Sequence, residues 1–163
     1  MTTTNQLLAT FWVGETRWAI DALQVQEILM NQPMVPVPRA EPSICGLINL
    51  RGQVVTSISL AERMGLGAQR STEPPFSVVV RTADGPVSLL VDNVGEVLNT
   101  SELRLDQPPD TLDERLRELV TGVYQLEDSL LLRLDVVRAT EVRAHSGSPE
   151  QASAREAEMV ASE

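Results

Sequence analysis

The stretch Gly46-Leu-Ile-Asn-Leu-Arg-Gly-Gln-Val-Val55 decides the fold, because two apolar segments flank a two-residue turn. Branched aliphatic residues on both sides of a glycine predict a β-hairpin, with strands at residues 46–50 and 53–59. Gly52 supplies the backbone freedom that the turn needs. Arg51 is not required for the turn, so the fold alone does not account for an arginine at the tip.

The rest of the chain repeats this pattern of short apolar segments separated by turn residues. An Asp84-Gly85 pair marks another hairpin, and Pro33, Pro36 and Pro38 confine any strand near them to a short or edge position. We predict an all-β fold with further strands at residues 6–13, 16–20, 25–30, 34–37, 76–81, 86–92, 94–98, 120–126 and 129–134.

Three short helices interrupt the predicted strands. Residues 60–65 have helix-favouring composition before a glycine, and residues 111–119 space their leucines along one helix face. Asp135 is placed to cap a helix over residues 136–142. Residues 67–75 have the composition of a loop. From residue 144 the chain lacks aromatic residues and is rich in Ser, Ala and Glu, which predicts a disordered acidic tail over residues 144–163.

The charge of the chain favours a protein partner. Its 163 residues carry a net charge of −10, and every basic residue is arginine. A protein of this charge without a basic run is repelled by nucleic acid and by anionic membranes. The first residues lack a basic segment, and no apolar run approaches the roughly 20 residues that span a bilayer, so we expect a cytoplasmic protein.

Residues for catalysis or cofactor binding are scarce. Cys45 is the single cysteine and His145 the single histidine, so neither an internal disulfide nor a Cys/His metal site can be assembled. A serine or cysteine nucleophile would have no histidine base outside the predicted tail. Adjacent acids such as Asp113-Glu114 suit a solvated surface better than a catalytic pair. We therefore expect no enzymatic activity and no cofactor.

Trp12 and Trp18 flank the first predicted turn and leave two interpretations open. Large aromatic residues on half-buried strands usually fill a core, which favours that role for both over an exposed aromatic groove. Cys45, between Ile44 and Gly46, is expected to be a small buried apolar residue.

The order of several motifs resembles that of CheW-family chemotaxis coupling proteins over about residues 7–142. The motifs are Val25-Gln-Glu-Ile28, the proline-rich loop ending at Arg39, Gly46-Leu-Ile-Asn-Leu-Arg-Gly52, Leu89-Leu-Val-Asp-Asn-Val94 leading to Val97-Leu98, and Leu132-Arg-Leu-Asp135. The resemblance implies two intertwined five-stranded SH3-like β-barrels and a short C-terminal helix. We expect one CheW-like domain at residues 1–143, with the N-terminal strands and residues 15–82 in one lobe and residues 83–143 in the other.

The same resemblance implies a non-catalytic adaptor in bacterial chemosensory signalling. Its partners would be the CheW-like domain of a CheA-type histidine kinase and the cytoplasmic tip of a methyl-accepting chemoreceptor, with recruitment to membrane receptor arrays. The output could be flagellar, pilus-based or another pathway. A free-standing SH3-like module that binds peptides is the alternative, although two Trp, two Phe and one Tyr supply little material for an aromatic groove.

Arg51 and Glu27 match motif positions that the resemblance implicates in partner binding. We expect Arg51 to project from the hairpin tip and pair with Glu27, beside apolar walls that include Val25 and Ile28, with Val97 coming from the other lobe. An ordinary solvated turn residue is the competing interpretation of Arg51, and an exposed pair would then contribute about 0–1 kcal/mol. The predicted partner-binding residues are Val25, Glu27, Ile28, Gly46, Arg51, Gly52 and Val97.

Overall fold

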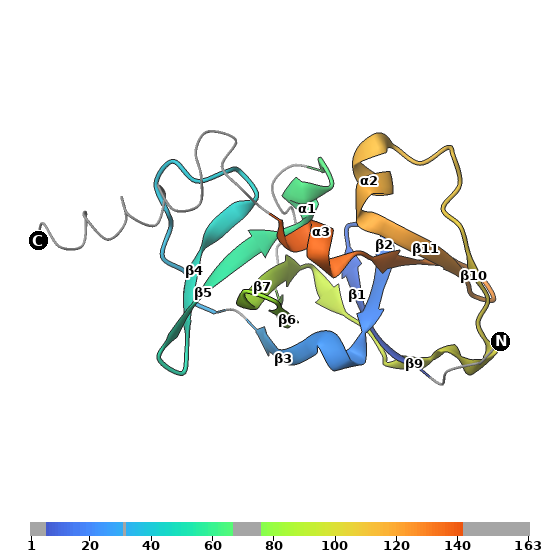
Figure 1. Ribbon diagram of the computed structural model, residues 1–163, viewed down its shortest axis with the longest axis horizontal. Coiled ribbons are helices and arrows are strands. Elements are labelled where there is room, and N and C mark those ends of the chain that lie inside the picture. Colours follow the sequence, from blue (N-terminus) through green and yellow to red (C-terminus); the bar gives the residue numbers. More distant parts are fainter. Residues whose placement is uncertain (1–5, 31, 67–75, 142–163) are drawn as a thin grey trace, which may run out of the picture.

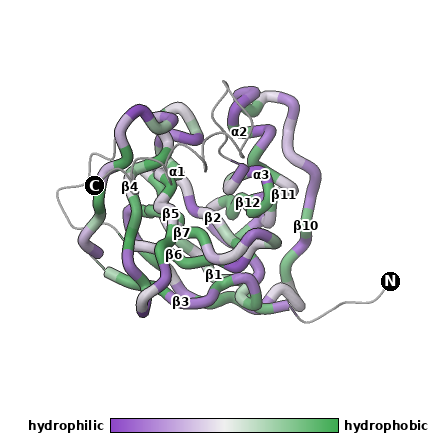
Figure 2. Tube along the Cα trace, turned by 60° about the vertical axis from the view of Figure 1, so that its left-hand side comes forward, coloured by the Kyte–Doolittle hydropathy of each residue, from purple (hydrophilic) through white to green (hydrophobic). Residues whose placement is uncertain are grey.

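The computed structural model describes residues 6–30, 32–66 and 76–141, which form two β-sheets and a few short helices (Figure 1). The predicted loop at 67–75 and the predicted tail at 144–163 lie outside the described residues. The all-β prediction is confirmed. Figure 2 shows hydrophobic residues gathered on the central strands and hydrophilic residues along the peripheral loops.

The middle of the chain forms a five-stranded sheet in the order β3-β6-β7-β5-β4. Its strands are β3 (Val25–Met30), β4 (Ile44–Leu50), β5 (Gln53–Ser59), β6 (Phe76–Thr82) and β7 (Gly85–Val91). The pairs β4–β5 and β6–β7 are antiparallel hairpins, and β5 joins β7 in parallel. The Val35 N–H donates to the Leu47 carbonyl at 2.9 Å and the Leu47 N–H to the Val35 carbonyl at 2.8 Å, which attaches the proline-rich segment to β4.

Both ends of the chain form a seven-stranded sheet in the order β10-β11-β12-β2-β1-β8, with β9 also paired to β1. Its strands are β1 (Leu7–Val13), β2 (Thr16–Asp21), β8 (Asn93–Val94), β9 (Leu98–Asn99), β10 (Leu105–Asp106), β11 (Val120–Gln125) and β12 (Leu130–Leu134). Parallel pairing of β12 with β2 places Leu132 beside Trp18 and joins the two ends of the domain.

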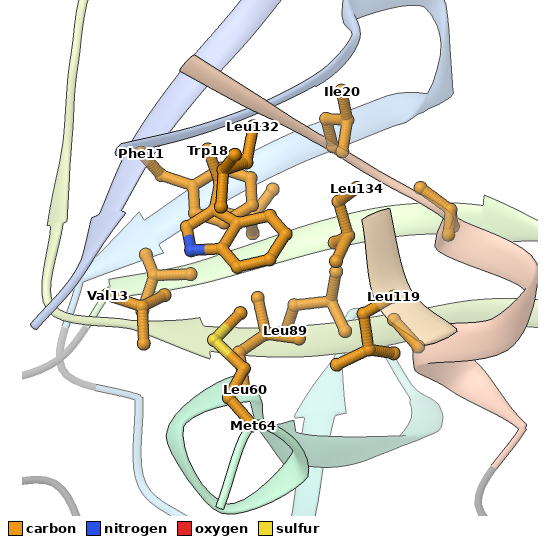
Figure 3. Close-up of a cluster of buried hydrophobic side chains, with 14 of the residues drawn as sticks. Phe11, Val13, Trp18, Ile20, Leu60, Met64, Leu89, Leu119, Leu132 and Leu134 are labelled. Atoms are coloured by element: carbon orange, nitrogen blue, oxygen red, sulfur yellow. The ribbon is translucent and has the colours of Figure 1, made fainter. Parts of the chain in front are cut away.

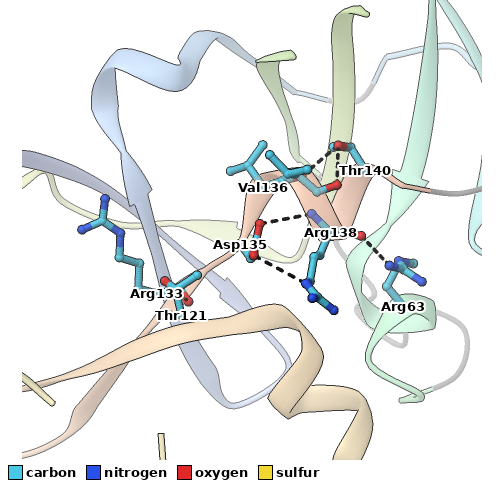
Figure 4. Close-up of polar contacts among 8 residues, drawn as sticks. Arg63, Thr121, Arg133, Asp135, Val136, Arg138 and Thr140 are labelled. Atoms are coloured by element: carbon cyan, nitrogen blue, oxygen red, sulfur yellow. Dashed lines mark hydrogen bonds and ion pairs between the residues drawn. The ribbon is translucent and has the colours of Figure 1, made fainter. Parts of the chain in front are cut away.

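Short helices connect the strands. They are α1 (Leu60–Arg63), α2 (Glu114–Leu119), α3 (Val136–Thr140) and the 3-10 turns η1 (Ala22–Gln24) and η2 (Thr100–Glu102). In all of them except α2, the side chain of the N-cap residue accepts from a first-turn amide. Asp135 Oδ1 accepts from the Arg138 N–H at 3.1 Å, as the sequence predicts for this N-cap (Figure 4). The Arg63 Nη2 donates to the Arg138 carbonyl at 2.5 Å, which links α1 to the end of α3.

Three details of the structure differ from the sequence expectations. The β6–β7 hairpin, which spans the expected lobe boundary near residue 82, lies entirely in the five-stranded sheet, while β1 and β2 share a sheet with the C-terminal strands. The second sheet has seven strands and not five, since three two-residue strands extend it. Residues 34–37 form an isolated bridge at Val35 and no strand, because the prolines of this segment lack the amide that a ladder needs.

One large hydrophobic core lies between the two sheets. Phe11 and Trp18 reach it from the seven-stranded sheet, while Val78 and Leu89 reach it from the five-stranded sheet, and Leu60 of α1 joins them (Figure 3). Trp18 is 0% exposed, which confirms its predicted core role.

Trp12 corrects the expectation that both tryptophans are core residues. Side chains alternate between the faces of a strand, so Trp12 points away from the face that carries Phe11 and Val13. Its ring is only partly buried and lies 5.6 Å from the Arg17 guanidinium carbon.

Candidate protein-docking site

The tip of the β4–β5 hairpin is a two-residue turn. Leu50 pairs with Gln53, so Arg51 and Gly52 alone form the loop. Their φ angles are 54° and 85°, and positive values at both positions define a type I′ turn. The Asn49 Oδ1 accepts from the Gly52 N–H at 2.8 Å, which holds the turn from the strand side. Sequence reasoning found this turn because Gly52 marks it.

Arg51 occupies a conformation that is costly for an arginine. A left-handed backbone costs a residue with a Cβ roughly 1–2 kcal/mol, and asparagine or glycine normally fills this place in a type I′ turn. Arg39 and Arg51 are the non-glycine residues of the described chain with positive φ. The turn therefore gives no reason for an arginine at position 51. The reason must lie in the contacts of its side chain.

The Arg51 guanidinium forms a bidentate ion pair with Glu27 of β3. Arg51 Nη1 lies 2.9 Å from Glu27 Oε2, and Arg51 Nη2 donates to Glu27 Oε1 at 3.1 Å. This confirms the predicted pair. The ion pair links the tip of the β4–β5 hairpin to β3, which lies at the opposite end of the strand order. The carboxylate side chain is 16% exposed and the arginine side chain 76%, so the carboxylate is covered while the guanidinium stays open to a partner.

β3 also carries apolar side chains, and its exposed ones lie on the face opposite to Glu27. Val25 is half-buried and packs against the main core, whereas Ile28 is 45% exposed. Sequence reasoning missed Met30, which follows Ile28 on the same outward face and is 61% exposed, and Val54 on the hairpin, which is 70% exposed. The alternation of β3 was the signal that could have found Met30.

Two predicted site residues occupy different places from those expected. Gly46 is a buried packing position in β4, where an added Cβ would lie 2.7 Å from the Val35 carbonyl oxygen. Val97 is 60% exposed but lies between β8 and β9 of the seven-stranded sheet. No hydrogen bond or core cluster of the described residues joins Val97 to β3 or to Arg51. The structure thus brings together Glu27, Arg51 and Gly52, whereas Ile28 projects from the other face of β3.

Cys45 is partly buried beside Ser59. Burial raises the pKa of its thiol above the ordinary value, which disfavours the reactive thiolate at neutral pH. This agrees with the expectation of a small apolar residue, although the side chain is only partly covered. Among the described residues, no group of three or more His, Cys, Asp or Glu side chains could hold a metal ion.

Replacing Arg51 by asparagine is expected to leave the free energy of unfolding within about 0.5 kcal/mol of wild type. The loss of an exposed ion pair costs about 0–1 kcal/mol, and asparagine recovers part of the backbone strain at this turn. Urea unfolding at equilibrium measures the difference. A destabilisation above about 2 kcal/mol would show that the Arg51–Glu27 pair holds the sheet together.

The hairpin tip thus presents an open, bidentate ion pair on a mostly β domain, which is the arrangement of a candidate protein-docking site. The family model for the CheW-like domain matches residues 8–143, and the chain belongs to this family of chemotaxis proteins. It is 30% identical over 145 residues to a chemotaxis protein CheW of Rhizobium meliloti, covering 88% of this chain and 94% of that one. It is 28% identical over 150 residues to a chemotaxis protein CheW of Bacillus subtilis, covering 91% and 96%.

A solved structure supports the fold. The crystal structure of the scaffolding protein TtCheW from Thermoanaerobacter tengcongensis matches with a TM-score of 0.73 and 23% identity, covering 83% of this chain and 87% of that chain. Within the described residues, no helix is both long enough and apolar enough to cross a membrane.

Proposed function

We propose that this protein is a non-catalytic adaptor that couples a methyl-accepting chemoreceptor to a CheA-type histidine kinase. Membership of the CheW-like family supports a role in chemotaxis, and the likeness to a scaffolding protein of the same kind supports an adaptor. The observation that carries the proposal for this chain is the Arg51–Glu27 pair, because a strained and exposed arginine is held in one orientation.

Energetics favour a binding role for Arg51 over a stabilising one. The backbone strain of about 1–2 kcal/mol equals or exceeds the 0–1 kcal/mol that an exposed ion pair contributes. Strain of this kind is typical of functional positions. Glu27 fixes both terminal nitrogens of the guanidinium while three quarters of the arginine side chain stays exposed, so a partner meets a preorganised cation.

The exposed apolar residues of β3 suit a helical partner. Ile28 and Met30 project from the same face of β3, and both are exposed. β3 is the edge strand of its sheet, so a helix packed along that edge can bury Ile28 and Met30 on one face while its polar flank meets Arg51 on the other. The cytoplasmic tip of a chemoreceptor, a hairpin of helices, has this form, and we assign it to this surface, which we call the β3-hairpin surface and define as Glu27, Ile28, Met30 and Arg51.

The proposal is tested by co-sedimentation with membranes that carry the cognate chemoreceptor, with and without the cognate kinase. Wild-type protein is expected to enter the pellet only when receptor is present and to raise kinase activity there. Arg51→Ala is expected to bind the receptor about tenfold more weakly or worse, as for a central interface residue, and to lose a matching share of kinase activation.

Arg104→Ala is the matched control, because Arg104 is also an exposed arginine paired with a carboxylate, at 3.0 Å from Asp106, but lies beside β10 on the other sheet. It should behave as wild type. The adaptor function is refuted if wild-type protein stays in the supernatant with every cognate receptor and kinase. The role of the β3-hairpin surface is refuted if both variants sediment like wild type.

A further inference from the structure

A second guanidinium with unusual surroundings lies on the seven-stranded sheet. Arg17 of β2 stands directly across from Trp12 of β1, and its guanidinium carbon is 5.6 Å from the centre of the Trp12 ring. This is a cation–π contact, which orients the cation without neutralising it. Arg17 and Trp12 are both partly buried.

The surrounding loop fixes one edge of this guanidinium. The Thr10 hydroxyl donates its single proton to the Glu96 carbonyl at 2.6 Å, so the same oxygen is free to accept from Arg17 Nη2 at 3.3 Å. Gly95 makes this approach possible, since a Cβ there would lie 2.5 Å from Thr10 Oγ1 and 3.4 Å from Arg17 Nη2. Glu96 is exposed, but its carboxylate does not pair with Arg17.

Arg17 lacks a carboxylate in the part of the chain that the structure describes. Its Nε is buried and has no acceptor there. Four other arginines each contact a carboxylate oxygen at 3.9 Å or less: Arg51, Arg104, Arg117 and Arg138. A partly desolvated cation without a counter-ion is unfavourable, and an acidic group brought by another molecule would relieve that cost. Arg63 also has a buried Nε without an acceptor, but its Nη2 donates to the Arg138 carbonyl inside the domain, whereas Arg17 lies against the partly buried ring of Trp12.

We propose that Arg17 and Trp12 form a second protein-docking patch that accepts a carboxylate side chain from a partner protein, with Val97 as its apolar contact. Val97 follows Glu96 directly and is 60% exposed. Tryptophan and arginine are the residues most enriched among binding hot spots. We call Trp12, Arg17 and Val97 the β1–β2 patch.

The β1–β2 patch gives the adaptor a second surface, and in this respect the inference rests on the proposed function. A coupling protein must hold two partners at once, so their footprints cannot coincide. The β3-hairpin surface belongs to the five-stranded sheet and the β1–β2 patch to the seven-stranded sheet, and Figure 1 shows the β4–β5 hairpin well apart from β1 and β2. With the receptor on the first surface, the second is left for the acidic side chain of the kinase.

The test measures, by isothermal titration at low and at physiological salt, the affinity of the full chain for the cognate kinase and for a soluble receptor-tip fragment. Arg17→Gln is expected to bind the kinase about tenfold more weakly or worse, with a flatter salt dependence, and to bind the receptor fragment normally. Arg17→Lys keeps the charge but not the planar fork, so its loss should be smaller. Arg104→Gln changes the net charge equally and should match wild type.

Kinase affinity and salt dependence of Arg17→Gln that equal those of Arg104→Gln would overturn the β1–β2 patch while leaving the proposed function intact. A loss of affinity for the receptor fragment alone would also overturn the patch. If wild type binds neither partner, the proposed function fails and the patch with it. Thermal unfolding of each variant checks that it is folded. If Arg17→Gln does not fold, Arg17→Lys replaces it, and a kinase affinity of Arg17→Lys identical to wild type would overturn the patch.

Discussion

Gly46→Ala is expected to lower the free energy of unfolding by about 2–3 kcal/mol, because the new methyl group would collide with main chain. Its Cβ would lie 2.7 Å from the Val35 carbonyl oxygen and 3.1 Å from the Val35 carbonyl carbon. Neither atom can rotate away as a side chain would. The same Val35 carbonyl accepts the 2.8 Å hydrogen bond from Leu47, so relief of the collision costs the bridge to the proline-rich segment.

Gly52→Ala is the matched control for this prediction. No heavy atom lies within 4 Å of a Cβ at Gly52, but its φ of 85° disfavours alanine. Gly52→Ala should therefore lower the free energy of unfolding only by the cost of placing alanine in a left-handed backbone conformation, about 1–2 kcal/mol. Equilibrium urea unfolding of the two variants separates the effects, since both remove a glycine and add one methyl group. A Gly46→Ala variant as stable as wild type would mean that the Val35 segment can move away from β4 freely.

Local pattern was enough to predict most strands of this fold. Residues 25–30 and 53–59 were predicted at their observed bounds, because apolar runs there end at clear turn or cap residues. Asp84-Gly85 likewise indicated the β6–β7 hairpin. The lobe boundary could not be found in this way. Which sheet a strand joins depends on pairing between distant segments, such as β2 with β12, and no local periodicity encodes that choice.

The candidate docking site could also be predicted only in part, because its residues meet through pairing between distant segments. The resemblance pointed to Arg51 and Glu27, and their bidentate contact lies where it was expected. Gly46 stands in the same motif as Arg51, yet its position is explained by close packing against Val35. The Arg17–Trp12 contact was not foreseen, because Trp12 was assigned to the core. The two residues face each other only through the β1–β2 register, which fixes the face of the sheet that each one occupies.

Trp18→Ala is expected to have the largest effect on stability, a loss of about 3–5 kcal/mol. Trp18 is the largest of the fully buried side chains and lies where the two sheets meet in one core (Figure 3). A small domain is stable by roughly 5–15 kcal/mol, so this loss would leave the variant close to unfolding. Urea unfolding followed by far-ultraviolet circular dichroism measures the change.

Trp18→Phe isolates the part of this loss that comes from volume. The indole Nε1 of Trp18 is buried and has no acceptor among the described residues, an arrangement that itself costs about 1–3 kcal/mol. Phenylalanine keeps most of the apolar contact and removes this unpaired donor, so it should cost about 1 kcal/mol or less. A loss as large as that of alanine would show that the indole N–H is in fact satisfied in solution.

The same variants test whether the two sheets unfold as one unit. Core residues from both sheets and from α1 and α3 form a single cluster, so damage at Trp18 should lower the stability of the whole domain in one transition. In Trp18→Phe the remaining fluorescence comes from Trp12 on the opposite face of β1, while circular dichroism reports both sheets. Coincident midpoints are expected. If fluorescence changes at a lower urea concentration than circular dichroism, the seven-stranded sheet unfolds first, and the two lobes are separate folding units despite their common core.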